Sequence, residues 1–318
     1  MQALPPDQHN ILEHLARRVG RVHLRQRLGI ERDNDSKIHH PGAGFLHIEN
    51  WYSIHALIRT SLRIVGLHAR GRRNSLDIRV NRYDVRLAAL PRAFDGYTIL
   101  QVSDPHLDMH RDYLDALIER VRELNYDLCV LTGDYRFRTY GPWSAAVAGM
   151  ERLRAHLRDP IYAVLGNHDS IRMVPGFEAA GLRVLLNESV QLERAGESLY
   201  LAGIDDAHYF GVDNIEKAGH DIPHGACAVM LSHTPEPYKQ VAHAGFHFML
   251  CGHTHGGQIC LPGGIPVFTD ARSPRRYARG FWRYHELVGY TSVGAGSSIV
   301  DVRLNCPPEV ALHTLHCA

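Results

Sequence analysis

The sequence contains no uninterrupted run of about 18 apolar residues, so it lacks the signal of a membrane-spanning helix. Its first residues, MQALPPDQHNILEHLARR, are polar, and we expect no secretory signal peptide. Internal repeats and low-complexity tracts are also missing. With 45% hydrophobic and 22% charged residues, the composition excludes wholesale disorder and predicts one large globular domain plus an extension, or two modest domains.

Cysteine pairs are missing too. The six cysteines form no CxxC pair and no spacing typical of a small disulfide framework. Several lie in apolar, strand-like runs such as LCVLTGD and FMLCGH, where a buried free cysteine is the ordinary interpretation. This pattern indicates a reducing compartment, and we expect a cytoplasmic location.

The charge is balanced over the whole chain but not along it. The formal net charge is +1, yet residues 1–92 carry 16 basic and 8 acidic residues, and residues 93–318 carry 19 basic and 26 acidic residues. A basic segment before an acidic body is typical of contact with an anionic surface, and it also arises by chance in a solvated face.

Two helical patterns lie in this basic segment. Residues 10–28 place apolar residues on one face, and residues 51–69 combine an apolar face with interleaved arginines and Trp51 at one end. Such a helix fits a membrane interface, and it equally fits a helix that packs on the main domain. We expect residues 1–75 to form a partly helical N-terminal extension and residues 76–318 to form the main domain, which carries the motifs described below.

From about residue 75 onward, short apolar strands alternate with helical patterns. We expect strands at 97–104, 127–134 and 161–169, with helices at 112–124 and 143–157 between them, which predicts a largely parallel sheet covered by helices. The later strands follow more closely, at 183–186, 190–193, 198–204, 226–232, 246–251, 287–293 and 309–315. Fewer helices separate them, which favours a second, more antiparallel sheet.

Polar side chains that suit a metal follow five of these apolar strands. In sequence they are the motifs Asp104-Pro105-His106, Gly133-Asp134, Gly166-Asn167-His168-Asp169, His233 and Gly252-His253-Thr254-His255. Ligands gather outside the carboxyl ends of strands in such sheets, so we expect these side chains to share one edge. Each motif alone is weak, but the ordered set is highly specific.

Imidazoles and carboxylates suit manganese, iron or zinc. Two divalent ions about 3.5–4 Å apart can polarise a phosphoryl group and acidify a bound water. We expect the glycines before Asp134, Asn167 and His253 to let the chain turn sharply into the site. The motifs therefore predict two-metal hydrolysis of a phosphate ester.

Together these motifs resemble the calcineurin-like metallophosphoesterase superfamily over roughly residues 94–315. The stretches GHTHGGQICLPGG and VRLNCPPEVALHTL further resemble the bacterial YkuE-like phosphodiesterase subgroup. The resemblance implies an α/β fold, a four-layer αββα sandwich of two mixed sheets, here with the N-terminal helical extension. It also implies attack by a metal-bridging hydroxide on a phosphodiester or pyrophosphate bond, with a nucleotide-linked lipid or phospholipid among the expected substrates.

The resemblance also assigns the residues. Asp104, His106, Asp134 and His255 would hold one metal ion. The second would be held by Asp134, Asn167, His233 and His253, with Asp134 bridging the two. His168 would stabilise the phosphoryl oxygens or protonate the leaving group, and Asp169 would orient it.

Further substrate contacts are open. Tyr135, Arg136 and Arg138 follow the bridging aspartate and could reach a phosphate, or they could be exposed loop residues. His208 and Tyr209 are candidates for the rim of the pocket.

Other functions also stay open. A nuclease or cyclic-nucleotide phosphodiesterase would use the same metal core, although the acidic body makes a nucleic-acid partner unexpected. A third hypothesis is a membrane-docking protein with a vestigial metal site. We expect a small-molecule or lipid-linked phosphate ester as substrate and peripheral contact with an anionic membrane through residues 1–75.

Overall fold

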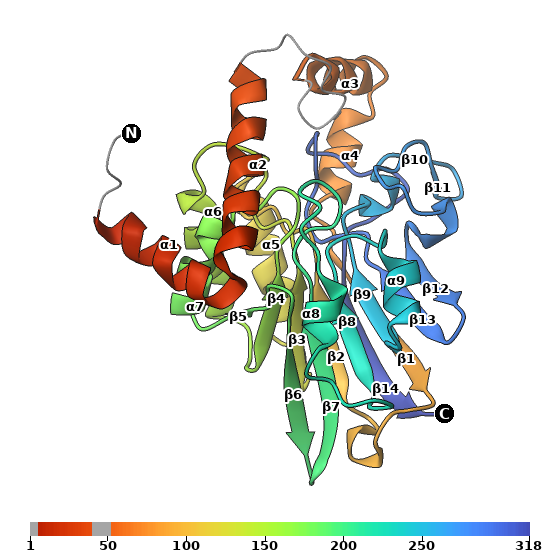
Figure 1. The fold of residues 1–318 in the computed structure, drawn as a ribbon. Coiled ribbons are helices and arrows are strands. Elements are labelled where there is room, and N and C mark those ends of the chain that lie inside the picture. The colour runs from red at the N-terminus through yellow and green to blue at the C-terminus, as the bar shows by residue number, and fades with distance from the viewer. Residues whose placement is uncertain (1–5, 40–51) are drawn as a thin grey trace.

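The computed structural model describes residues 6–39 and 52–318, and two six-stranded sheets lie at its centre (Figure 1). The sheets pack face to face, and helices cover the outer face of each. The protein is thus the four-layer αββα sandwich of two mixed sheets that the sequence predicts. Helices also precede the first strand, as expected. Trp51, at one end of the second predicted helix, lies outside the described residues.

The first sheet has the strand order β1-β14-β2-β3-β4-β5. These strands are β1 (Arg79–Leu87), β14 (Glu309–Cys317), β2 (Thr98–Val102), β3 (Leu128–Thr132), β4 (Ile161–Val164) and β5 (Arg183–Val184). Strands β2 to β5 are parallel, β14 runs antiparallel to β2, and β1 runs parallel to β14. The carboxyl ends of β2, β3 and β4 therefore meet at one edge.

The second sheet has the order β12-β13-β9-β8-β7-β6. Its strands are β12 (Gly280–Tyr284), β13 (Leu287–Thr291), β9 (Phe248–Cys251), β8 (Ala228–Leu231), β7 (Glu197–Gly203) and β6 (Glu188–Arg194). Only the edge pairs β12–β13 and β6–β7 are antiparallel, and the inner pairs are parallel. The expected antiparallel character is therefore confined to the edges. A separate hairpin joins β10 (Cys260–Leu261) to β11 (Ile265–Pro266).

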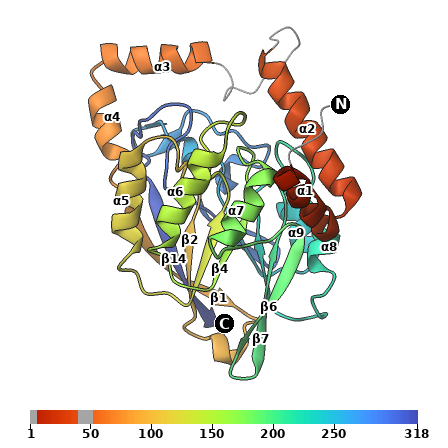
Figure 2. The ribbon, with the colours of Figure 1, turned by 90° about the vertical axis from the view of Figure 1, so that its left-hand side faces the viewer.

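Helices from both halves of the chain form the outer layers. Figure 2 shows α5 (Arg111–Val121), α6 (Ser144–Arg154) and α7 (Val174–Ala179) on the outer side of the first sheet. The short helices α8 (Ile215–Gly219) and α9 (Tyr238–His243) pack against the second sheet. Helix α5 buries one face because its apolar residues recur at helical spacing.

Four strands were missed, namely β1, β12 and the two short strands β10 and β11, and two strands were assigned to the wrong sheet. β1, with the sequence RVNRYDVRL, buries only Val85 and Leu87, so its arginines hide the apolar alternation. β12 is equally mixed, with Trp282 as its one buried residue. The strand predicted at 183–186 is β5 of the first sheet, where it pairs with β4. The strand predicted at 309–315 also belongs to the first sheet, where it pairs with both β1 and β2.

The helix expected at 10–28 is in fact two helices. Helix α1 (Pro6–Val19) ends at Gly20, whose φ of +91° lies in the left-handed region, and α2 (Arg21–His39) then starts in a new direction. Leu15 and Val19 are buried in the same apolar cluster as α5, α6 and α7, whereas Val22 is 72% exposed. Helix α1 therefore packs on the main domain, in the same helical layer as α5, α6 and α7.

The second predicted helix is also divided. Helix α3 (Tyr52–Ile64) is followed by a left-handed turn at Gly66 and by α4 (His68–Asn74). Gly71 of α4 lies against Val302, where a Cβ would come within 2.8 Å. Within the described ranges, no helix has the length and apolarity needed to cross a membrane.

The burial of α1 leads to a stability prediction. Leu15→Ala should lower the free energy of unfolding by about 2–5 kcal/mol, because Leu15 is fully buried. Val22→Ala, at an exposed position of α2, is the matched control and should change it by less than about 0.5 kcal/mol. Urea denaturation measures both values. An unchanged midpoint for Leu15→Ala would show that α1 is not part of the cooperative unit.

Candidate metal centre

The five strand ends that carry the motifs meet at one edge of the sandwich. Strands β2, β3 and β4 supply Asp104, His106, Asp134 and Asn167, and strands β8 and β9 supply His233, His253 and His255. All of these side chains are buried. The geometry therefore brings all seven expected metal ligands together.

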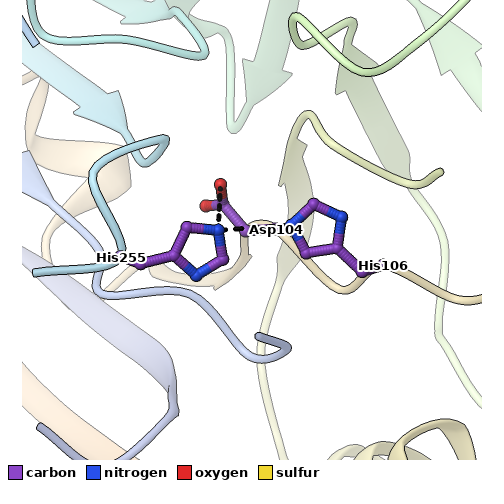
Figure 3. Close-up of side chains that lie close together, drawn as sticks. All are labelled: Asp104, His106 and His255. Atoms are coloured by element: carbon purple, nitrogen blue, oxygen red, sulfur yellow. Dashed lines mark hydrogen bonds and ion pairs between the residues drawn. The ribbon is translucent and has the colours of Figure 1, made fainter. Parts of the chain in front are cut away.

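One group contains Asp104, His106 and His255, which point toward one another in Figure 3. The Nε2 atoms of His106 and His255 are 3.2 Å apart, and His255 Nε2 lies 3.5 Å from Asp104 Oδ1. Asp134 falls in a group with His106 and His168, whose ligand atoms all lie within 4.8 Å of one another.

A second group contains Asp134, His233 and His253. His233 Nε2 lies 3.3 Å from Asp134 Oδ2 and 2.9 Å from Asn167 Oδ1. Asp134 thus has imidazole partners in both groups. That position suits a carboxylate that bridges two ions.

Backbone carbonyls orient two of these rings. His106 Nδ1 lies 2.9 Å from the carbonyl oxygen of Arg136, and His233 Nδ1 lies 2.8 Å from that of Thr132. A carbonyl only accepts hydrogen bonds, so each Nδ1 carries a proton and each Nε2 faces the shared space. Burial also lowers the pKa of His106 to about 4, which leaves its Nε2 without a proton at neutral pH.

The cluster fits metal ions because it contains many acceptors and few donors. Carboxylate oxygens of Asp104 and Asp134, the amide oxygen of Asn167 and Nε2 of His106 all converge in a buried space. Such a cluster is unfavourable unless cations lie between the acceptors. Its mixed imidazole and carboxylate composition suits divalent transition metals.

The backbone of the site is strained. Five of the seven residues have left-handed φ values, between 43° and 71°: Asp104, His106, Asp134, His253 and His255. Asp and His tolerate this region better than most residues, but each such position still costs about 1–3 kcal/mol. The surrounding contacts must therefore hold these residues in place.

The three glycines do not all act as we expected. Gly133 alone has a positive φ, at +92°. At Gly166 a Cβ would lie 2.2 Å from Asp134 Oδ1, and at Gly252 it would lie 1.9 Å from Ser103 Oγ. These two glycines are required because neighbouring strand ends approach so closely.

Asp169 contacts the backbone and not the ring of His168. Its carboxylate accepts hydrogen bonds of 2.8–3.2 Å from four backbone N–H groups, those of Asp134, Tyr135, Arg136 and Gly166. The Nδ1 of His168 instead lies 2.6 Å from the carbonyl oxygen of Phe137. Phe137 therefore supplies the orienting contact that we expected of Asp169, and Asp169 fixes the loop that carries Asp134.

The expected substrate residues differ in where they point. Tyr135 is fully buried in the apolar core, where its hydroxyl contacts the Leu131 and Val164 carbonyls, so the expectation that it reaches a phosphate is corrected. Arg136 is also buried, and its guanidinium donates to the carbonyls of His168 and Gly141. Arg138 is exposed.

His208 and Tyr209, the expected rim residues, lie near the second group. The ring of His208 packs on that of His253 with centroids 4.2 Å apart, and its Nδ1 lies 2.8 Å from Glu236 Oε1. The backbone N–H of Tyr209 donates to Asp206.

Arg303 was missed by the sequence analysis. It lies fully buried behind His255, with Nη2 3.0 Å from His255 Nδ1, and it donates to the carbonyls of Val293 and Gly296. Burial and the Arg303 charge together hold the pKa of His255 well below its ordinary value, so the ring stays neutral. The segment VRLNCPPEVALHTL supported the resemblance, but nothing in the sequence places Arg303 behind a ligand.

Helix α2 also reaches the site, which the sequence did not reveal. Arg27 is fully buried and donates to the Asp169 carbonyl at 2.8 Å. Glu31 accepts hydrogen bonds from Ser170 Oγ and from the Ile171 backbone N–H, at 2.8 and 2.9 Å. Helix α2 therefore holds the loop that carries His168 in place.

The pKa of His233 generates a prediction for metal binding. Burial lowers this pKa, but the charge of Asp134, its hydrogen bond and the charge of Asp104 outweigh burial and hold it well above the ordinary value. The metal-free protein therefore keeps a proton on His233 at neutral pH, and a metal must displace it. Affinity for Mn²⁺ or Zn²⁺ should rise with pH as this proton becomes easier to remove.

Isothermal titration in buffers of different ionisation enthalpy measures the released proton. His285→Asn, at an exposed position, should release as many protons as the unaltered protein. His233→Asn should release fewer. Equal release from all three proteins would contradict the role assigned to His233.

Comparisons with known proteins agree with this geometry. Residues 97–257 match the family described as calcineurin-like phosphoesterase. The chain is 28% identical to the metallophosphoesterase YkoQ of Bacillus subtilis over 254 residues, covering 76% of this chain and 92% of YkoQ. It is also 28% identical to YkuE of the same organism over 251 residues, covering 75% of this chain and 85% of YkuE.

A third relative is the phosphodiesterase YaeI of Escherichia coli, at 29% identity over 160 residues, which covers 48% of this chain and 57% of YaeI. The match at residues 97–257 spans half of the chain and contains all seven expected ligands. The similarity to YkoQ and YkuE also supports the resemblance to the bacterial YkuE-like subgroup. The chain therefore belongs to the calcineurin-like phosphoesterase family and is a metal-dependent phosphoester hydrolase.

Proposed function

We propose that the protein hydrolyses a phosphodiester or pyrophosphate bond with two divalent cations held at the carboxyl ends of five strands. The supporting observation is the buried cluster of acceptors, in which Asp134 has imidazole partners on both sides. The proposed ligands are Asp104, His106, Asp134 and His255 for one ion, and Asp134, Asn167, His233 and His253 for the other. Manganese, iron and zinc all suit this set of side chains.

The bound cations would neutralise the phosphoryl oxygens and acidify a water molecule. The chain's own residues would position the ester. Because carbonyls anchor the far nitrogens of His106 and His233, their near nitrogens face the shared space, one in each proposed group of ligands, and the reacting phosphorus would lie beside the two groups. Burial of the cluster excludes bulk water, which strengthens each charge interaction with the phosphoryl group.

His168 is the proposed acid. Its Nδ1 is held by the Phe137 carbonyl, and its Nε2 faces the cluster, 3.7 Å from Asp134 Oδ2. In the protonated ring both nitrogens donate, so Nε2 can donate to a phosphoryl oxygen or give its proton to the leaving oxygen. The contacts of Asp169 support a role other than orienting His168, namely holding the loop that carries Asp134.

A diester or pyrophosphate substrate is proposed over a phosphoprotein. YaeI, one of the relatives, is named a phosphodiesterase. A nucleotide-linked lipid or phospholipid is the finer proposal, and the surface near α3 supports it. Leu57, Ile64 and Val65 on and after α3 are each more than 60% exposed, next to the exposed Arg63.

This surface also supports peripheral contact with an anionic membrane, and we propose that the chain acts in the cytoplasm. The full chain should co-sediment with vesicles that contain phosphatidylglycerol, and Ile64→Asp should weaken that binding because it removes apolar area and adds a repelled charge. Val22→Asp, on α2, is the matched control. Equal binding of the two variants would contradict a membrane contact through α3.

The central prediction concerns His168 and Asp134. With Mn²⁺ and bis(p-nitrophenyl) phosphate, His168→Ala should lower kcat by about 10²–10⁴-fold, because a positioned proton donor contributes that much. Asp134→Asn should abolish turnover, because it removes the negative charge between the two groups.

Circular dichroism and thermal unfolding should show both variants folded. His220→Ala, at an exposed position, should keep full activity. Full activity of His168→Ala or Asp134→Asn would refute the assigned role. Faster turnover of p-nitrophenyl phosphate than of the diester would refute the diester proposal.

A further inference from the structure

A largely apolar pocket lies directly beside the proposed metal ligands. Its volume is about 410 Å³, within the ~300–1,000 Å³ that is typical of ligand sites. His253, Thr254 and His255 form one wall. The rest of the lining is mostly apolar and comes from α3, from the segments around the β10–β11 hairpin and from residues 298–300: Ile58, Ile259, Val267, Phe268, Ile299 and Val300.

The shared wall places the pocket relative to the reaction. A phosphate that contacts the ions at His253 and His255 would lie at the inner end of this pocket. Any group attached to that phosphate on this side would enter an environment with few polar partners, chiefly Asp270, Gln258 and Ser298. The pocket therefore favours an apolar substituent on the ester.

The segments around the pocket also carry most of the exposed apolar side chains. The structure has ten large apolar side chains exposed to solvent among its described residues, and eight of them lie on or just after α3 or in the β10–β11 region. These eight are Leu57, Ile64, Val65, Leu67, Leu261, Ile265, Val267 and Phe268. In Figure 1, α3 lies above this hairpin. Two of the eight, Val267 and Phe268, line the pocket, and the others lie on or beside the segments that contribute to its lining. A concentration of exposed apolar area beside a pocket is typical of a binding site.

The backbone at the pocket is strained. Ile299 has a φ of +62°, a conformation that a β-branched residue rarely adopts. Such strain persists only where neighbouring contacts enforce it, and it clusters at ligand sites. Gln258 supplies those contacts, because it donates to the carbonyls of Ser298 and Val300 and accepts from the Ser298 backbone N–H.

Positive charge lies on the segments around the pocket. Arg63 on α3 is exposed, and Arg59 forms an ion pair with Asp301 at 3.8 Å. Arg279 lies against the hairpin at Gly264. An apolar pocket whose neighbouring segments carry basic side chains complements a molecule that joins a hydrocarbon chain to an anionic phosphate.

We propose that this pocket is a subsite for the hydrocarbon chain of an amphiphilic phosphate ester whose phosphate lies on the metal centre. The proposal rests on the proposed function and specifies its substrate class. The hydrocarbon chain of the substrate would pack between Ile58 and Val267, against Phe268 and Ile299. The neighbouring basic side chains would meet the remaining anionic part of the molecule.

A series of alkyl p-nitrophenyl phosphodiesters, from methyl to decyl and each kept below its critical micelle concentration, tests the subsite. With Mn²⁺ bound, kcat/KM should rise by about fourfold for each methylene that becomes buried, the equivalent of about 0.8 kcal/mol. The rise should stop when the pocket is full. A flat series in the unaltered protein would overturn the proposal.

Two variants locate the effect. Val267→Asp places a charge in the wall and should flatten the chain-length series. Ile299→Gly should also flatten it while the protein stays folded, because glycine accepts the positive φ without strain. Val22→Asp, the same change at an exposed position of α2 outside the pocket lining, should leave the series unaltered. A steep series in both pocket variants would overturn the proposed location.

Binding without turnover separates this proposal from the proposed function. Decyl phosphonate should bind the metal-loaded protein more tightly than methyl phosphonate by isothermal titration, and Val267→Asp should reduce that difference. If no ester is hydrolysed but this difference appears, the catalytic proposal fails and the subsite stands. If methyl esters are hydrolysed but the difference is missing, the subsite fails and the catalytic proposal stands.

Discussion

The constraint on which the rest of this structure depends is a buried cluster of hydrogen-bond acceptors. Two aspartates, an asparagine and the near nitrogens of several histidines share a space from which solvent is largely excluded. Their mutual repulsion is tolerable only with cations between them, and cations can enter only if the acceptors are held in advance. The carbonyls behind His106 and His233 supply that holding, and so do the four N–H groups on Asp169. The left-handed backbone at five ligands is what brings these atoms so close together.

The two-sheet sandwich follows from the same need. One sheet alone would deliver ligands from β2, β3 and β4, all on one side of the ions. The second sheet adds His233, His253 and His255 from the opposite side, so that each ion can be surrounded. The backbone N–H of His253 donates to the Asp104 carboxylate at 3.1 Å, which ties the two strand ends together. Gly252 permits this approach because any side chain there would overlap Ser103.

The sequence predicts the parts of this protein that depend on local pattern. Strands such as LCVLT are wholly buried and are followed by a polar motif, so the sequence predicts both that they lie inside a sheet and which candidate ligands follow them. β1 is not readable in the same way, because Arg79, Arg82 and Arg86 face solvent at the sheet edge and mask its alternation. Tyr135 shows a different limit. It directly follows Asp134 in the chain, yet its side chain points into the core, and only the three-dimensional turn decides which neighbour faces the site.

Contacts over long sequence distances were the least predictable. Arg27 and Glu31 look like ordinary charges on a helix, and nothing nearby in the sequence indicates that they fix residues 169–171. Arg303 is similar, since its partner His255 lies 48 positions earlier. The boundary between an extension over residues 1–75 and the main domain stays a prediction, and the burial of Leu15 shows that α1 shares the apolar core of the first sheet.

The long-range contacts of α2 also affect the order in which the protein can fold during its synthesis. His23 and its partner Asp205 are 182 residues apart in the sequence, and Arg27 is 142 residues from Asp169, whose carbonyl it contacts. At ~5–20 residues per second, translation separates His23 from Asp205 by roughly 10 to 35 s. Until their partners have been made, α1 and α2 keep apolar residues such as Leu15 uncovered. Helix α2 can fix the loop that carries His168 only once residues 169–171 have been synthesised.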